Sequence, residues 1–234
     1  MSTQSEATHG SKLNNAETLL THLNSFADYQ PGIEEIKPAF LATLIADAKV
    51  NNQAVAANQQ AYSAKVEYRQ QLFKKDKDSL LALLSPIGAA VRFNLNKNSK
   101  AAKDISKMIA KIRGIKPAKD KKDPKDEQVS QSHRSYGSIT QYFADLVTTL
   151  VSLKDEYKPS NPSTTVNNLN DKLQQATQSN NSVAKVYGKL KESRDDRGVQ
   201  YHKLTDNTQR IKDAVKSQYL LGSTEYNLIK GLKI

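Results

Sequence analysis

The sequence predicts an all-α protein, an elongated helical bundle built from two tandem pseudo-symmetric repeats with long helices. The 234 residues include only 9 Gly and 7 Pro, and so few punctuating residues are typical of long helices and not of many short strands. Apolar residues recur at helical spacing along most of the chain. The third observation is an internal match between the two halves of the sequence.

The internal match appears when the sequence is shifted by 128 positions. Residues 16–78 then share 12 identities with the second half without a gap. Tyr29 and Pro31 fall on Tyr157 and Pro159. The apolar matches that follow step by three or four residues, which is the period of one helix face. Because repeats determine architecture, the match predicts two equivalent helical halves.

The repeats define the expected domain organisation. Residues 1–12 are predicted to be a disordered tail, and residues 13–115 form the first repeat. Residues 116–133 are rich in Lys, Asp and Pro without apolar periodicity, which predicts a charged linker. Residues 134–234 form the second repeat. Each repeat should hold a short helix, a long helix, a continuation of that helix and a short closing helix.

The first repeat contains four expected helices, each marked by local signals. They cover residues 13–28, 33–75, 79–94 and 99–113. The first presents Leu19 and Leu23 on one face, and the tandem Pro31-Gly32 predicts the turn after it. The last has Ser99 where an N-cap belongs and Gly114 where a C′ glycine belongs.

The second repeat follows the same plan. Its expected helices cover residues 134–157, 163–196, a continuation to 219, and a short segment after Gly222-Ser223. A four-residue gap aligns Ile87 with Ile211 and so extends the match. Tyr29 and Tyr157 each lie just before a proline-containing turn, and we expect them to anchor these turns.

Composition limits the class of protein. The chain has no cysteine, which excludes disulfides, thiol nucleophiles and Cys-based metal sites. No run approaches the roughly 18 apolar residues of a membrane span, and the polar N-terminus is not a signal peptide. We therefore expect a soluble cytoplasmic protein and do not expect a membrane partner.

Motifs for catalysis are missing from the sequence. The four histidines form no His-x-x-x-His pair, and there is no glycine-rich phosphate loop or nucleophile elbow. Asp195 and Asp196 lie between Arg194 and Arg197, but neighbouring residues diverge by about 100° on a helix. We expect a solvated ion-pair cluster there, and no enzyme, metal or cofactor.

Asn52 and Asn180 are matched polar residues between apolar positions of the two long helices. One interpretation is a buried pair that sets the helix register, as polar residues do in coiled coils. The other is two exposed asparagines in Asn-rich stretches. The sequence leaves both open.

The strongest functional indication is a basic segment. Residues 96–125 carry ten Lys and one Arg against three Asp, whereas the net charge of the whole chain is +11. Such a segment could neutralise the phosphates of a nucleic acid or contact another anionic partner, such as an acidic protein. Its candidate binding residues are Lys100, Lys103, Lys107, Lys111, Arg113, Lys116, Lys119, Lys121 and Lys122.

The alternative is that these lysines are a solvated helix face. Aromatic residues interleaved for stacking on single strands are absent from the segment, since the nearest are Phe93 and Tyr136.

The most apolar stretch of the chain covers residues 80–91. It could be a core helix, a protein interface or a segment that inserts into a membrane, although it is too short to span one. The interface reading involves Leu80, Leu81, Leu84, Ile87 and Val91.

Four motifs resemble an uncharacterised family of all-helical proteins from Bacteroidota. They are Ser-Pro-Ile-Gly-Ala-Ala-Val-Arg at 85–92, Ile-Ala-Lys-Ile-Arg-Gly at 109–114, Tyr-Lys-Pro-Ser-Asn at 157–161 and Gly-Ser-Thr-Glu-Tyr at 222–226. The resemblance implies a helical fold over most of residues 28–234 and implies no activity.

These observations favour a non-enzymatic binding or structural protein whose basic helix and linker contact an anionic partner. The runner-up is a self-assembling scaffold or protein-interaction bundle, and so a homo-oligomer. An enzyme of unknown type comes third.

Overall fold

In a computed structural model of the protein, residues 8–115 and 135–234 are described, and all their regular elements are helical, without a strand. The all-α prediction is confirmed. The predicted linker 116–133 lies outside the described residues. Within the predicted tail, the first helix already begins at His9, because the Thr8 hydroxyl accepts a hydrogen bond from the Ser11 N–H (3.1 Å) and caps it.

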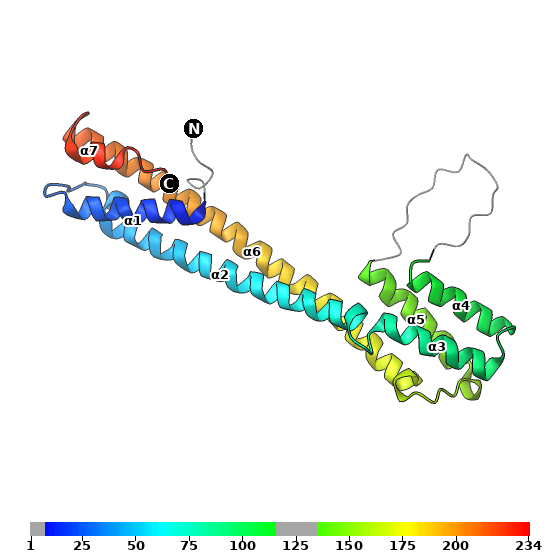
Figure 1. The fold of residues 1–234 in the computed structure, drawn as a ribbon. Helices are drawn as coiled ribbons and strands as arrows, with labels where there is room; N and C mark the ends of the chain where they lie inside the picture. The colour runs from blue at the N-terminus through cyan, green and yellow to red at the C-terminus, as the bar shows by residue number, and fades with distance from the viewer. Residues whose placement is uncertain (1–7, 116–134) are drawn as a thin grey trace, which may run out of the picture. The chain divides into compact units, whose positions relative to one another are not determined.

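Seven α-helices follow one another along the described chain (Figure 1). They are α1 (His9–Ser25), α2 (Pro38–Gln70), α3 (Leu80–Leu95), α4 (Lys100–Ile112), α5 (Tyr136–Ser152), α6 (Val166–Tyr219) and α7 (Thr224–Ile229). One 3-10 turn, η2 (Glu34–Ile36), precedes α2, and another, η5 (Pro162–Thr164), precedes α6.

The long helices differ from their predicted bounds. The helix expected over 33–75 starts only at Pro38, and it ends in a π-helical turn, η3 (Gln71–Lys75). The two pieces expected in the second repeat form one uninterrupted helix of 54 residues. Gly198 lies inside it, because the cost of about 1 kcal/mol for a helical glycine is small beside the packing of the helix.

The chain divides into two compact units. Unit 1 combines Met1–Ala61 with Tyr187–Ile234, and unit 2 is Tyr62–Val186. This division does not follow the predicted boundaries of the repeats, because each unit takes part of each repeat. Both α2 and α6 run through the point of division.

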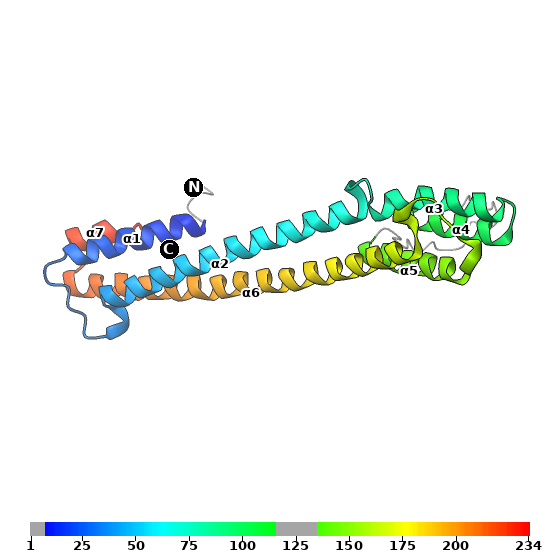
Figure 2. The same cartoon turned by 90° about the horizontal axis from the view of Figure 1, so that it is seen from below.

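Unit 1 contains α1, the first part of α2, the last part of α6, and α7. Figures 1 and 2 both show α1 alongside α7 and the end of α6. Its core is formed by apolar side chains from all four helices, including Leu19, Leu41, Leu204, Ile211 and Ile229. The C-terminal segment lies against α1, where the Asn15 side-chain amide donates to the Lys233 carbonyl (2.8 Å).

Unit 2 contains the end of α2, α3, α4, α5 and the first part of α6. Its core is larger in side-chain volume and includes Phe73, Phe143, Leu84, Ile105 and Leu146. Lys172 of α6 holds the start of α3 through an ion pair with Asp78 (2.7 Å).

The two predicted anchoring tyrosines make the same contact, each within its own unit. The Tyr29 hydroxyl donates to the Ile36 carbonyl at 2.9 Å, and the Tyr157 hydroxyl donates to the Thr164 carbonyl at 2.8 Å. Both rings are buried. Each tyrosine therefore ties a turn to the 3-10 segment before a long helix, as the sequence predicts.

Candidate functional site

Helix α4 carries the predicted anion-binding lysines, and its ends are defined by the predicted caps. The Ser99 hydroxyl accepts from the Ala102 N–H at 3.2 Å. Gly114 has φ +70°, and the Ile115 N–H donates to the Ala110 carbonyl at 2.9 Å. This Schellman arrangement ends the helix because only glycine adopts a left-handed backbone without strain.

One face of α4 is buried in unit 2. Ala102, Ile105, Ile109 and Ile112 pack into its core. Gly88 of α3 allows a close approach, because a Cβ there would lie 3.2 Å from the Ile109 Cδ1. The helix is therefore held by its apolar face, which leaves the opposite face to solvent.

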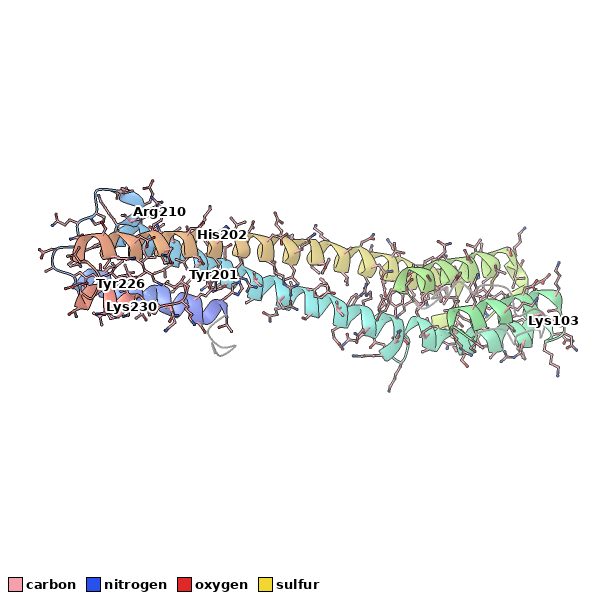
Figure 3. All side chains as sticks on the ribbon, turned by 90° about the horizontal axis from the view of Figure 1, so that it is seen from above. Lys103, Tyr201, His202, Arg210, Tyr226 and Lys230 are labelled. Carbon is pink, nitrogen blue, oxygen red and sulfur yellow. The ribbon has the colours of Figure 1, made fainter. Side chains whose placement is uncertain are left out.

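The opposite face carries the lysine file, which we define as Lys100, Lys103, Lys107 and Lys111. All four are exposed. At about 100° per residue, they fall within an arc of about 80° that is centred opposite the buried face. Figure 3 shows Lys103 extending away from the helices of unit 2.

Few groups compete for the charges of the lysine file. The Lys107 Nζ lies 3.4 Å from an Asp104 carboxylate oxygen, but its side chain is 80% exposed, and such surface pairs contribute little. The Lys111 Nζ lies 4.1 Å from the centre of the Tyr142 ring. Among the described residues, Lys100 and Lys103 have no carboxylate within ion-pair distance. The file is thus available to an anion in solution.

Three further cations extend this basic surface. Arg92 and Lys97 come from the end of α3 and the turn after it, and Arg113 caps α4; all three are exposed. Residues 92–115 carry seven cations and a single carboxylate, that of Asp104. The remaining predicted binding residues, Lys116, Lys119, Lys121 and Lys122, lie outside the described residues.

The predicted interface residues of α3 lie mostly inside unit 2. Leu80, Leu84, Ile87 and Val91 are at most 1% exposed, and Leu81 is partly buried against the same core. Of the alternatives that the sequence leaves open, the core helix is the one that these exposures match. A partner could reach the four buried side chains only if the unit opened.

Phe93, which the sequence marks only as an aromatic residue near the basic segment, has a side chain that is 86% exposed. It lies on the face of α3 directed away from the core and just before the turn that leads into α4. The signal was present, because Phe93 is out of phase with the buried positions Ile87 and Val91 on a helix of 3.6 residues per turn. The apolar stretch 80–91, taken as one block, does not reveal that phase.

The matched asparagines each make one polar contact. The Asn52 amide donates to the Tyr201 hydroxyl at 2.8 Å, and that hydroxyl donates to the His9 carbonyl at 2.9 Å. The Asn180 amide donates to the Thr140 hydroxyl at 3.0 Å. The two asparagines do not pair with each other, so each links helices within its own unit.

His9 borders this network. Its ring packs edge-on against Tyr201, with 4.5 Å between the ring centres. Burial lowers the pKa of His9, and the nearby charges of Arg197 and Lys12 lower it further. Figure 3 shows Tyr201 directed into unit 1 and His202 directed away from it. The network stabilises the start of α1.

The charged cluster at 194–197 is not an ion-pair cluster. Arg194 donates to the Gln59 side-chain oxygen at 2.8 Å. Asp195 and Asp196 are exposed, and neither forms an ion pair within the described part of the chain. The two aspartates are exposed to solvent, as expected, but Arg194 links α6 to α2.

Across 8–115 and 135–234, no three His, Asp or Glu side chains are grouped closely enough to hold a metal ion. In the same ranges, none of the helices combines the length and apolarity that crossing a membrane requires.

No protein-family model, curated protein or solved structure matches the chain.

Proposed function

We propose that the protein is a non-enzymatic binding protein whose basic helix α4 contacts an anionic partner. The observation that carries this proposal is the lysine file. Its four lysines are exposed on one face of α4, whose opposite face packs into the core of unit 2. A helix held in this way presents its cations without a folding cost on binding. Lys100, Lys103, Lys107, Lys111 and Arg113 are the binding residues of the proposal.

Binding of this kind depends on salt. Each phosphate that is neutralised releases counterions, so four contacts to duplex DNA lower the affinity by about 100-fold between 50 and 200 mM salt. Contacts from lysines to phosphates carry no sequence information, and we expect little preference for sequence.

The test is a fluorescence anisotropy titration with labelled DNA, RNA and heparin at those two salt concentrations. A variant with Lys100, Lys103, Lys107 and Lys111 changed to Gln should bind at least tenfold more weakly. The matched control changes Lys185, Lys189, Lys191 and Lys203 to Gln, which removes the same charge from exposed positions of α6. The absence of binding at low salt, or an equal loss in the control, would overturn the proposal.

A second candidate function is self-assembly, and one observation favours it. The turn before α7 exposes Leu220 (70%) and Leu221 (74%), and Leu228 of α7 is 46% exposed. Leucines that are open to water on one turn are typical of a contact surface. Light scattering across a concentration series should then show a rising mass, which Leu220→Ser with Leu221→Ser abolishes.

We also infer that the chain is a tandem pseudo-symmetric repeat. The tyrosine contacts 128 residues apart support it, as do the Ser99 and Ser223 caps 124 residues apart. The two spacings differ by four residues because residues 76–79 separate η3 from α3 in the first half. The matching part of α6 in the second half continues without a break. From the sequence features given above, we also propose a cytoplasmic location and membership of the Bacteroidota family.

A further inference from the structure

We propose that the anionic partner is a single-stranded nucleic acid, with one unpaired base stacked on Phe93 and the backbone following the lysine file. This inference rests on the proposed function, and it names the partner of the same site. It needs an accessible aromatic ring near a line of cations. Phe93 is exposed at the end of α3, and a short turn connects that end to the start of the file.

The turn between α3 and α4 places Phe93 at the beginning of the lysine file. Helix α3 ends at Leu95 and α4 begins at Lys100. Asn96 reverses the chain with φ +64°, and its side chain accepts from the Asn98 N–H at 3.2 Å. The end of α3 and the start of α4 therefore lie at the same end of unit 2.

The surroundings of Phe93 suit a nucleotide. A shallow, widely open hollow is lined by Arg92, Phe93, Asn94, Leu95, Asn96 and Lys97. The ring can stack on a base, a contact that tolerates any sequence because every base has a π-face. Arg92 and Lys97 flank the ring and can bind the adjoining phosphates, so the hollow offers both kinds of contact.

The length of the lysine file matches a short strand. From Lys100 to Lys111 the helix rises about 16 Å, which equals about five nucleotides at 3.4 Å each. With the nucleotides beside Phe93, the site would cover about six to eight, within the range of known single-strand sites.

A single strand fits these features better than the other polyanions. A duplex has no unpaired base for Phe93, so the ring would stay in water. An anionic bilayer is a plane, whereas the file is one residue wide and has Asp104 beside it. A single exposed Phe is also a weak anchor, since stable membrane attachment takes two signals.

The experiment compares a labelled 12-nucleotide DNA strand, its 12-base-pair duplex, heparin, and phosphatidylcholine vesicles with 30% phosphatidylglycerol. Phe93→Ala should raise the Kd for the single strand about tenfold, because stacking contributes about 1–3 kcal/mol per base, and should leave the Kd values for duplex and heparin within twofold. Phe93→Tyr should bind the single strand like the wild type, while Phe93→Leu should not, since it keeps bulk but loses the ring.

Val199→Ala is the matched control. It truncates an exposed apolar side chain of α6 in unit 1 and should change no Kd. All variants replace exposed residues, and circular dichroism checks that they fold.

The outcomes separate this inference from the proposed function. If duplex and heparin binding depends on the lysines but the single strand shows no dependence on Phe93, the inference is overturned and the proposed function stands. Vesicle binding that is lost in Phe93→Ala, with unchanged strand binding, would overturn the inference in favour of a lipid surface. If none of the four probes binds at low salt, both fail.

Discussion

The helix pair α3–α4 in unit 2 is compared with the end of α6 and α7 in unit 1. The two pairs bury residues at matching positions but expose surfaces of different charge. Residues 124 apart correspond, so that Ile105 and Ile229 are both fully buried and Ser99 and Ser223 both cap a helix. Asn96 and Leu220 both reverse the chain with positive φ. The inward residues and the turn geometry therefore agree.

The solvent-facing residues of the two helix pairs differ in charge and polarity. Residues 92–115 hold seven cations and one carboxylate, while residues 216–234 hold three lysines and one glutamate. On the outer face of α3, Ala89 and Phe93 stand where α6 has Asp213 and Ser217. Packing restricts only the side chains that face the core, so exposed residues can differ without disturbing the fold, and it is in the surface that function should be sought.

The largest expected effect tests whether matching buried residues of the two cores contribute equally to the free energy of unfolding. Ile105→Ala should lower the free energy of unfolding by about 3–4 kcal/mol, and Ile229→Ala by about 2 kcal/mol. Ile105 lies within a helix of 13 residues, whereas Ile229 ends a helix of only six. Urea denaturation gives the energies.

Hydrogen exchange of the same variants locates the effects. Ile229→Ala should lower protection mainly in α7, and Ile105→Ala mainly in unit 2. Equal loss of protection in both units for either variant would contradict the division into two compact units.

The tyrosine anchors should be equivalent. Tyr29→Phe and Tyr157→Phe each leave a buried carbonyl without its hydroxyl donor, at a cost of about 1–2 kcal/mol. Burial, with a smaller effect of nearby Tyr219, raises the pKa of Tyr29 to about 12, in keeping with a hydroxyl that stays protonated. Chemical denaturation measures both variants, with the half-exposed Tyr68→Phe as the control. A twofold difference between the two costs would show that the anchors are not interchangeable.

A reciprocal exchange tests the two reversing residues. A left-handed backbone costs a leucine roughly 1 kcal/mol more than an asparagine, so Leu220→Asn should stabilise the protein and Asn96→Leu should destabilise it by similar amounts. Thermal unfolding gives both shifts. Shifts of the same sign would mean that contacts of the side chains, and not the backbone, dominate at these turns.

The smallest effect concerns pH. The pKa of His9 is lowered in the folded protein, so the unfolded chain binds the proton more readily. The stability that the neutral ring contributes is present above the unfolded pKa of about 6.5 and is lost as the pH falls below it. The start of α5, which corresponds to that of α1, has no histidine.

Comparing the free energy of unfolding at pH 7.5 and 5.5 should therefore show a small loss that His9→Gln reduces. The partly buried His22→Gln serves as the control. An unchanged pH dependence in His9→Gln would assign the loss to other groups.

Much of the fold could be predicted because its signals are local. Ser99 and Gly114 mark the ends of α4 by the chemistry of capping, and the helix period identifies Ile105 and Ile109 as buried. The bounds of α6 could not be predicted, since Gly198 weakens a helix locally while packing along its length outweighs that cost.

Part of the candidate site could be predicted in the same way. The phase of the lysine file is a property of one helix, and so is the exposure that follows from it. The turn that joins the end of α3 to the start of α4 depends on how the two helices pack, which no single helix period contains. The role of Arg194 was misjudged for the same reason, as its partner Gln59 lies 135 residues away.

The sequence by itself determined that the chain is helical, where α4 begins and ends, and which of its faces is charged, because caps and helix periods act over a few residues. Only the tertiary structure decided that each compact unit combines parts of both halves, that Leu84 and Ile87 are core, and that Phe93 is exposed. These features depend on which distant helices share an apolar face, and several pairings satisfy the same hydrophobic pattern until the side chains are packed.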